Sequence, residues 1–392
     1  MGKYTEYLEM NLSFSRLAEE RKKQLKRISQ IRDGRDVLVY AANLSVGNAP
    51  ITIAYDDLLP INDQLANLNG DELDLIIETP GGSGEVAEDM VRLLRGRYEK
   101  GMAVIVPGWA KSAGTILAMS GNEILMEPVS ALGPIDAQLS WQGKIFSAHA
   151  LLEGMDKIKK EVEKTGVLNK AHIPILQGIS PGELQSAENA LNFAKKLVTD
   201  WLVNYKFKYW EVHSGNKQPV TEADKEKRAK EIAEQLCDHN RWLTHGRSIK
   251  LQDLEGMRLK ITDYSKHPDL ADAIRRYYTL LQMTFNAGVY KIFETPTSQI
   301  YRMVRPQSSV PMPPAPGVAS AADGAEIDVE CAQCHAISKV QANLGKQSPL
   351  KAGHIPFPAS NKLKCPKCGI ELDLTDIRRQ LEAVSKKQIV AE

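Results

Sequence analysis

Short apolar runs alternate with amphipathic segments over the first third of the chain. The apolar runs have the length of buried strands, and the segments between them carry apolar residues at helical spacing. We predict strands at 36–40, 51–55, 73–78, 103–106 and 123–126, and helices near 57–68, 84–99 and 112–120. This alternation predicts an α/β fold built from right-handed ββα units with parallel strands.

Helical periodicity is the main pattern outside this region. Residues 1–33 carry a stripe of apolar residues among basic ones, which predicts an amphipathic helix. Residues 181–212, 221–238 and 268–294 also show helical periodicity. We expect these later helices to flank the functional site or to form contacts between subunits.

Two glycine-containing turns stand where an apolar run gives way to a helix. They are residues 78–84 (ETPGGSG) and residues 108–115 (GWAKSAGT). Such turns present free backbone N–H groups at a helix N-terminus. Ser112 is a candidate nucleophile, and the N–H groups of Gly82 and Ala113 are candidate donors to an oxyanion. Taken singly, each segment is also explained as an ordinary turn before a helix.

The order of these motifs resembles a known superfamily. The chain resembles the ClpP/crotonase fold in the order of its elements and motifs. This order is a strand, TPGG, a helix, a strand, GxAxSxG and a helix, followed by residues 122–126 (NEILM). Residues 112–119 (SAGTILAM) and 131–138 (ALGPIDAQ) resemble the serine dehydrogenase proteinase (SDH) family, which is related to signal-peptide-peptidase-like serine proteases. The resemblance covers about residues 35–265. It implies a repeated ββα spiral core with added helices and a serine endopeptidase, a hydrolase that forms an acyl-enzyme on Ser112.

The same resemblance implies a triad in the order Ser, Asp, His. This chain meets that order with Ser112, Asp136 and His245, the last of which lies in residues 242–249 (WLTHGRSI), similar to a family segment WTHxxxI. Asp136 follows a Gly-Pro turn, where an aspartate commonly caps the turn instead. Other histidines are rival bases: His149, His172, His213 and His239.

A Ser-Lys dyad is an alternative mechanism, because signal-peptide-peptidase relatives place a lysine 40 to 50 residues beyond the serine. That window holds four lysines: Lys157, Lys159, Lys160 and Lys164. They lie in a highly charged helical stretch that is typical of a solvated face, whereas a base lysine must be desolvated. Lys111, next to the nucleophile, is expected to point elsewhere.

The composition changes to Pro, Ser, Ala and Gly between residues 304 and 325, which predicts a linker. A separate module, residues 326–392, follows with a terminal helix. It carries two CxxC pairs 30 residues apart: Cys331, Cys334, Cys365 and Cys368. Four thiolates in two such pairs are typical of a zinc ribbon, and the zinc is expected to be structural because no ligand position is left for water.

Two other chemistries fit the first cysteine pair less well. Cys331 to His335 also matches the c-type haem attachment pattern, which requires an exported chain. Disulfides are disfavoured in a cytosolic chain. Cys237 is expected to be a buried structural thiol. We expect the zinc-ribbon-like module to recruit a substrate or a regulatory protein, and we do not expect nucleic-acid binding, because its basic patch is small.

The pattern therefore divides the chain into five parts. They are an N-terminal amphipathic helix (1–33), a ClpP/crotonase-like serine protease domain (34–265), a helical extension (266–303), the linker (304–325) and the zinc-ribbon-like module (326–392). The fold implied by the resemblance is usually found in rings or stacks, so we expect a homo-oligomer.

Composition adds constraints on the class of protein. The 392 residues are 43% hydrophobic with a formal net charge of +1, which permits a sizeable core and gives no general nucleic-acid signal. No run of 18 apolar residues and no signal-peptide pattern occurs, so we expect a cytoplasmic protein without a membrane anchor. A non-catalytic scaffold that binds a peptide or an acyl group with the same backbone amides remains the alternative function of another class.

Overall fold

The computed structural model describes residues 2–141, 144–213, 215, 217–304, 324–331, 333–385 and 387–390. The chain divides into two compact units, residues 1–304 and residues 305–392. No helix in the described ranges is long and apolar enough to cross a membrane.

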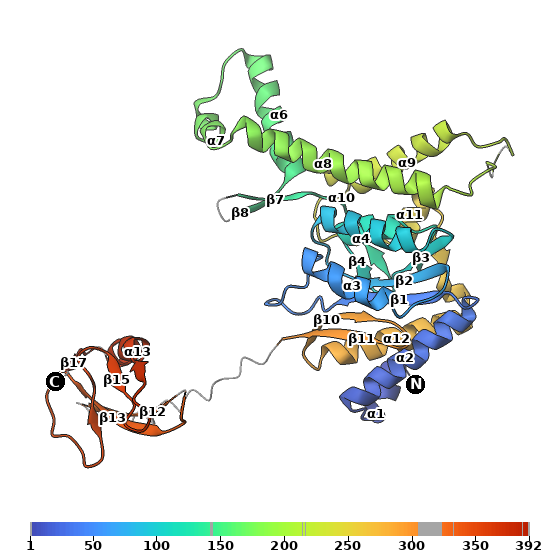
Figure 1. The fold of residues 1–392 in the computed structure, drawn as a ribbon. Helices are drawn as coiled ribbons and strands as arrows, with labels where there is room; N and C mark the ends of the chain where they lie inside the picture. Colours follow the sequence, from blue (N-terminus) through green and yellow to red (C-terminus); the bar gives the residue numbers. More distant parts are fainter. Residues whose placement is uncertain are drawn as a thin grey trace. The chain divides into compact units, whose positions relative to one another are not determined.

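A seven-stranded sheet forms the centre of the described part of the first unit (Figure 1). Its order is β11-β10-β1-β2-β3-β5-β9. Five neighbouring strands run parallel: β1 (Asp36–Ala42), β2 (Glu72–Glu78), β3 (Gly101–Ile105), β5 (Glu123–Met126) and β9 (Thr262–Asp263). Two antiparallel strands extend the β1 edge: β10 (Val289–Glu294) and β11 (Gln299–Met303). The parallel part contains four of the five strands that the apolar runs predict: β1, β2, β3 and β5.

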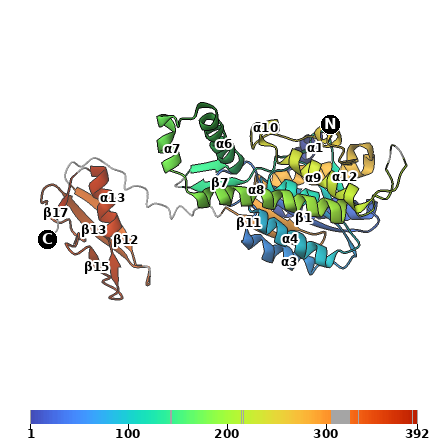
Figure 2. The same ribbon diagram turned by 90° about the horizontal axis from the view of Figure 1, so that it is seen from above.

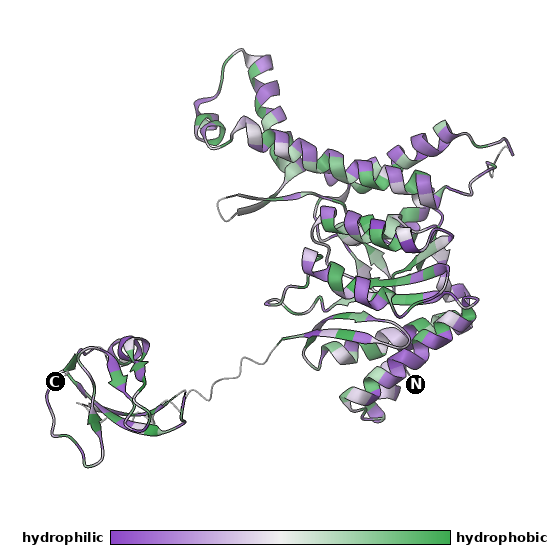
Figure 3. Ribbon diagram, in the orientation of Figure 1, coloured by the Kyte–Doolittle hydropathy of each residue, from purple (hydrophilic) through white to green (hydrophobic). Residues whose placement is uncertain are grey.

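Helices cover both faces of this sheet. Side chains alternate along β1, so that Leu38 and Tyr40 pack into one core while Val37 and Val39 pack into the other. On the first face lie α3 (Leu58–Leu65), α4 (Gly84–Arg97) and α5 (Ala113–Met119), and on the second lie α2 (Phe14–Ile31) and α12 (Pro268–Phe285). Burial on both faces explains why β1 and β2 are hydrophobic almost throughout, whereas the helices keep hydrophilic faces (Figure 3).

A second helical layer lies beyond α5. Helix α8 (Pro181–Trp201) starts with a capping box between Ser180 and Glu183, and its Val198 and Trp201 pack into the core shared with α5. The hairpin of β7 (Gln138–Trp141) and β8 (Lys144–Ser147) leads into α6 (Ala148–Thr165) and α7 (Ile173–Gln177), which extend beyond the sheet (Figure 2). Farther along the chain come α9 (Glu222–Leu236), α10 (His239–Trp242) and α11 (Leu251–Gly256). This layer carries the chain from Asp136 to His245.

The N-terminal segment is two helices rather than one. Helix α1 (Lys3–Glu9) ends before Asn11, whose φ of 46° breaks the helical path, and α2 begins at Phe14 behind the capping residue Ser13. Helix α2 belongs to the first unit, because Leu25 and Ile28 are buried against the sheet and the buried Arg21 pairs with Glu294 at 2.9 Å. The predicted single helix over 1–33 is therefore corrected.

Two further predictions from periodicity are wrong. Residues 51–55 are not a strand of the sheet, because Ile53 pairs instead with the glycine turn through bonds to Gly81 O and from Ser83 N–H. The helix predicted over 268–294 ends at Phe285, and residues 289–294 form β10 on the edge of β1. The segment 266–303 is accordingly no helical extension: β10 and β11 are part of the main sheet.

The second unit is a small β-rich fold with its own core. Antiparallel β12 (Gly324–Glu330) and β13 (Ile337–Leu344) pair with the short strands β14 (Ile355–Pro356) and β17 (Ile389–Val390). A hairpin of β15 (Lys362–Lys364) and β16 (Glu371–Asp373) precedes α13 (Thr375–Ser385). Val340, Phe357 and Leu374 are buried at the centre. Residues 305–323, most of the predicted linker, lie outside the described residues.

Candidate active site

Ser112 occupies a strained turn at the start of α5. The N–H of Gly114 donates to the carbonyl of Lys111 at 2.8 Å, which closes a turn with Ser112 as its first central residue. The backbone angles of Ser112 are φ 52° and ψ −117°, the conformation that glycine usually supplies in a type II′ turn. A serine held in such a conformation is a mark of functional sites. Its side chain does not cap the helix, so Oγ is not committed to α5.

The two glycines of the TPGG segment pack directly against this turn. A Cβ on Gly81 would lie 2.7 Å from the Cβ of Ser112, and the φ of Gly81 is 101°. A Cβ on Gly82 would lie 2.9 Å from Ile53 Cα and closer still to the backbone N and O of that residue, at a φ of 148°. Only glycine fits at either position, so the close approach of the two predicted turns depends on both.

Two backbone N–H groups beside Ser112 have no acceptor in the described part of the protein. The N–H of Gly81 donates to Thr79 Oγ1 at 3.1 Å. Among the described residues, the N–H groups of Gly82 and Ala113 donate to no protein atom, and Gly82 is exposed. Free amides of this kind can hold a developing negative charge on a carbonyl oxygen. These are the two amides that the sequence singles out.

Replacing Gly82 by alanine is expected to disrupt the site. The new Cβ meets the backbone of Ile53, so we expect the free energy of unfolding to fall by about 3 kcal/mol and labelling of Ser112 by a fluorophosphonate to be lost. Urea unfolding and labelling measure the two effects. Gly84→Ala is the matched control, because its Cβ makes only ordinary contact with Phe193 at 3.4 Å. Equal stability and labelling in the two variants would contradict this prediction.

Glu78, at the end of the strand before the TPGG segment, bonds to the segment that carries Ser112. It is 2% exposed at the end of β2, and its carboxylate accepts the N–H of Trp109 at 2.9 Å and the hydroxyl of Tyr278 at 3.0 Å. Beside it, the N–H of Thr79 donates to Trp109 O and the N–H of Lys111 donates to Thr79 O. Burial raises the pKa of Glu78 to about 7, although the bonds from Trp109 and Tyr278 favour the ionised form.

The raised pKa of Glu78 predicts a pH-dependent stability. Between pH 4.5 and 7 the folded protein keeps a proton that the unfolded chain releases, so stability falls as pH rises through this window. The full cost, about 3 kcal/mol, is present above pH 7. Glu78→Gln removes this loss of stability. In urea unfolding at pH 5 and pH 8, the free energy of unfolding of the variant should therefore increase relative to that of the wild type as pH rises. Glu99→Gln, at an exposed position, is the control; an unchanged pH slope in Glu78→Gln would refute the assignment.

Two histidines approach the carboxylate of Asp136. The residue is 5% exposed. Its Oδ1 accepts the hydroxyl of Ser147 at 2.6 Å, and its Oδ2 accepts Nε2 of Gln138 at 2.8 Å. Nδ1 of His245 is 3.9 Å from Oδ2, and Nδ1 of His239 is 3.5 Å from the same oxygen. The structure therefore brings Asp136 and His245 together, and it places one of the rival bases, His239, closer to the same oxygen.

The loop that carries His245 is tied to the serine turn. Leu243 has a φ of 67° and ends α10, which turns the chain back toward the sheet. Nζ of Lys111 donates to the carbonyl of Gly246, next to His245, and Ile249 pairs with Leu132. Lys111 is thus used to hold this loop, in agreement with the expectation that it points away from the nucleophilic oxygen.

The remaining candidate bases have other surroundings. The ring of His149 stacks on that of His239 with centroids 5.5 Å apart. His172 is hydrogen-bonded to Glu161, and His213 faces Asp224 at 3.7 Å. The four lysines proposed for a dyad are all exposed on α6: Lys157, Lys159, Lys160 and Lys164. Two of them pair with neighbouring carboxylates on the same helix, so none has the desolvated setting that a base lysine needs.

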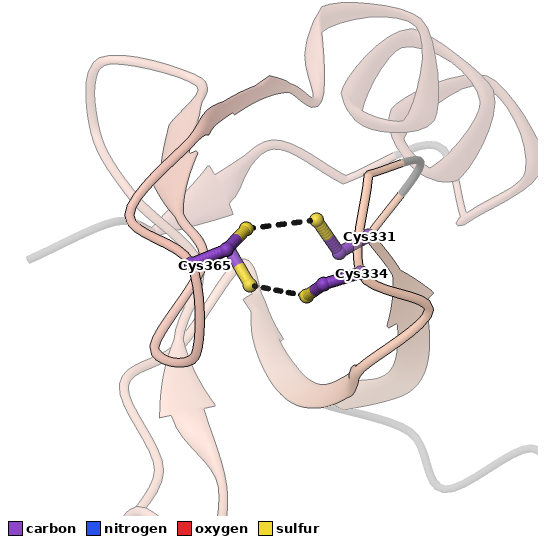
Figure 4. Close-up of side chains that lie close together, drawn as sticks. Cys331, Cys334 and Cys365 are labelled. Atoms are coloured by element: carbon purple, nitrogen blue, oxygen red, sulfur yellow. Dashed lines mark hydrogen bonds between the residues drawn. The ribbon is translucent and has the colours of Figure 1, made fainter.

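The four cysteines of the second unit form one cluster. Cys331 and Cys334 lie in the turn after β12, and Cys365 and Cys368 lie in the turn between β15 and β16 (Figure 4). All four Sγ atoms are within 4.8 Å of one another, with separations of 3.5 Å and 3.7 Å across the two turns. Tetrahedral zinc with Zn–S bonds of about 2.3 Å places sulfurs about 3.8 Å apart, so the cluster fits such an ion.

The backbone of each turn favours a thiolate at the first cysteine of its pair. The N–H groups of Cys368 and Lys367 lower the pKa of the Cys365 thiol to about 6. The N–H groups of Cys334 and Gln333 lower the pKa of Cys331 in the corresponding turn. Hydrogen bonds to the charged form favour it, and a thiolate is the form that binds a metal. The remaining cysteine, Cys237, is buried in the first unit, where burial raises its pKa to about 12.

The fold and the arrangement around Ser112 define a ClpP-like α/β protein that carries a serine at a strand-to-helix turn, followed by a second unit with a four-cysteine cluster. The family profile described as ClpP-like SDH-type serine proteinase matches residues 7–175. The resemblance to the SDH family and the ClpP-like fold are thereby confirmed for this part of the chain.

Individual relatives match over shorter stretches. Two uncharacterized proteins of Methanocaldococcus jannaschii are 28% identical over 137 residues and 40% identical over 67 residues; the matches cover 34% and 17% of this chain and 47% and 23% of those proteins. The chain thus spans less than half the length of these relatives. A solved variant of the 1510-N membrane-bound stomatin-specific protease, in complex with a substrate peptide, is 16% identical with a TM-score of 0.32, and covers 58% of this chain and 75% of that one.

Several residues of this site were not singled out by the sequence. Glu78 stands between an apolar strand and the TPGG turn, a position that is itself a signal for a buried carboxylate near the site. Ser147 and Gln138, which hold Asp136, have no signal in the sequence beyond their polarity. His239 is one of several histidines until the fold places it beside Asp136.

Proposed function

We propose that this chain is a serine endopeptidase that cleaves peptide bonds through an acyl-enzyme on Ser112. The observation that carries the proposal is the type II′ turn that holds Ser112 against Gly81, with two free amides beside it. A ClpP-like SDH-type profile over the same residues supports it. The substrate is then a protein or a peptide.

Each residue of the site has a role in this reaction. His245 takes the proton of Ser112 Oγ as that oxygen attacks the peptide carbonyl, while the N–H groups of Gly82 and Ala113 hold the oxyanion. His245 then gives the proton to the leaving amine, and water hydrolyses the acyl-enzyme by the same steps. Asp136 orients the imidazole and stabilises its protonated form. Since Nδ1 of His245 faces Asp136, Nε2 is the nitrogen left for the serine.

Fluorophosphonate labelling of the full chain tests this assignment. We expect Ser112→Ala to abolish labelling and His245→Ala to slow it at least about 100-fold, because the base is lost. Lys164→Ala, on the exposed face of α6, should label at the wild-type rate. Labelling that survives in Ser112→Ala would refute the peptidase and leave a peptide-binding or acyl-binding scaffold as the function. Loss of labelling in Lys164→Ala alone would instead support the dyad.

The second unit is proposed to hold one structural zinc ion on Cys331, Cys334, Cys365 and Cys368. When bound, the ion would join the two hairpin turns. Ile337 and Ile370, each a few residues beyond a cysteine pair, are 65% and 40% exposed. Exposed apolar side chains on a rigid turn suit the recruitment of a protein partner or substrate.

Assembly into a homo-oligomer is also a proposal, drawn from the family resemblance. Helix α6 supports it, because among its residues with described side chains only Ala148 is buried. Leu151 and Leu152 at the start of α6 pack against the cluster that contains Ala187 and Leu191 of α8, whereas Ile158 and Val162 farther along the helix are half-buried and can pack on another subunit. Light scattering of the full chain measures the mass; a monomer at all concentrations would refute this part of the proposal.

A further inference from the structure

Two imidazoles converge on a single carboxylate oxygen. Nδ1 of His239 is 3.5 Å and Nδ1 of His245 is 3.9 Å from Oδ2 of Asp136. Both distances are too long for a hydrogen bond. Nδ1 of His245 is buried without a hydrogen-bond partner in the described part of the chain. Both imidazoles therefore approach the same acceptor, and neither forms a hydrogen bond with it.

The acceptor has room for only one of them. A carboxylate oxygen offers two lone pairs, and Nε2 of Gln138 already occupies one at Oδ2, at 2.8 Å. At the other oxygen, Oδ1, the hydroxyl of Ser147 occupies one lone pair at 2.6 Å. An N–H of His239 and an N–H of His245 consequently compete for the one remaining lone pair of Oδ2, the oxygen that both rings approach.

The two competitors are held differently. His239 begins α10, which Asp238 caps by accepting two backbone N–H groups, and its ring stacks on that of His149. His245 lies in the loop beyond α10, where its side chain is 37% exposed. The more firmly placed and nearer imidazole is thus the one outside the proposed triad.

A cavity lies next to His239. Its ring partner His149 and its chain neighbour Asp238 line this cavity of about 410 Å³ together with Lys195, Glu231, Glu234 and Cys237. The charged and titratable groups near this stack are Glu153, which faces His149 at 3.8 Å, and the cavity residues already named. A rotation of His239 toward this cavity would move its Nδ1 farther from Oδ2 of Asp136 and leave the remaining lone pair of that oxygen to His245 alone.

We propose that His239 is a positioning residue that competes with His245 for Oδ2 of Asp136 and holds the site in a resting arrangement. The inference rests on the proposed triad. When a peptide substrate binds and displaces His239 from Asp136, His245 can bond to Asp136 and the triad is complete. The triad therefore assembles only when the active site holds a substrate.

Two substitutions of His239 separate the competition from a structural role. His239→Phe keeps a ring to stack on His149 but has no N–H, whereas His239→Asn keeps a donor close to the place of Nδ1. We expect His239→Phe to raise the rate of fluorophosphonate labelling of Ser112 about fivefold, because the fraction of competent molecules rises. His239→Asn should label at nearly the wild-type rate. His172→Phe, at a histidine bonded to Glu161, is the control for losing a histidine elsewhere.

Proton NMR of the same variants gives a readout that does not depend on the reaction. A low-field imidazole N–H resonance, assigned to His245 by its loss in Asp136→Asn and in His245→Ala, should strengthen in His239→Phe and not in His239→Asn. An unchanged resonance and labelling rate in His239→Phe would overturn the inference while leaving the peptidase intact. Slower labelling in His239→Phe would also overturn it, by making His239 the base itself. If wild-type protein does not label at all, the proposed function fails, and the NMR comparison alone decides the competition.

Discussion

Ser112→Gly should abolish peptide hydrolysis and at the same time make the protein more stable. Loss of the hydroxyl removes the nucleophile, so the hydrolysis rate should fall by at least about 10⁴-fold. The backbone of Ser112 is held at φ 52° and ψ −117°, a conformation in which a side chain costs about 1 kcal/mol or more relative to glycine. We therefore expect the free energy of unfolding to rise by about 1 kcal/mol, measured by urea unfolding beside a peptide-hydrolysis assay.

Ser112→Ala is the matched control for this prediction. It removes the same hydroxyl but keeps a Cβ at the strained position, so the hydrolysis rate falls equally while stability remains near that of the wild type. The two variants together separate the nucleophile from the strain. A loss of stability in Ser112→Gly relative to Ser112→Ala would show that the turn is not under strain, and residual hydrolysis in both would show that Ser112 is not the nucleophile.

The strain at Ser112 and the absence of a Cβ at Gly81 have the same physical origin. The turn of 111–114 presses against the TPGG segment so closely that a Cβ on Gly81 would lie 2.7 Å from the Cβ of Ser112. Glu78 supports this contact by bonding the backbone of Trp109 from the end of β2. The backbone strain at Ser112 and the buried carboxylate of Glu78 above pH 4.5 both lower the stability of the fold. In return, they hold the two backbone segments close together beside the nucleophile.

The sequence predicts the parts of the fold that depend on local pattern. Strands β1, β2, β3 and β5 are apolar because both of their faces are buried, so their runs stand out from the amphipathic helices between them. The prediction fails where the secondary structure of a segment depends on contacts with residues far away in the sequence. Residues 289–294 form a strand because β1 is there to pair with them, although their apolar spacing also fits a helix.

The same division applies to the candidate site. Ser112, Gly82 and Ala113 follow from two local turns, and the pairing of Asp136 with His245 follows from the family resemblance. The hydrogen bond between Glu78 and Tyr278 joins residues 200 positions apart, so no local sequence pattern predicts it. His239 is only six residues from His245, yet its approach to Asp136 depends on how α10 is capped and turned. Placement by the fold, and not residue type, separates these two histidines.

Removal of the metal from the second unit should unfold that unit and spare the first. The core of residues 324–390 is small, and a four-thiolate zinc site supplies about 10–16 kcal/mol at neutral pH, more than so small a core can provide alone. We therefore expect Cys365→Ser, or treatment of the full chain with a strong zinc chelator, to make residues 324–390 sensitive to limited proteolysis. Metal content, measured by plasma mass spectrometry, should fall from one zinc ion per chain to near zero.

Labelling of Ser112 is expected to continue at the wild-type rate in the same Cys365→Ser protein, because the first unit has its own core and the site lies within residues 1–304. Cys237→Ala is the matched control: it removes a buried thiol from the first unit and should leave the zinc content at one per chain. Retention of zinc and of protease resistance in Cys365→Ser would refute the four-cysteine site. Loss of Ser112 labelling together with the zinc would show instead that the second unit is needed to hold the serine site in its active arrangement, which is the kind of dependence expected if this unit presents substrates to it.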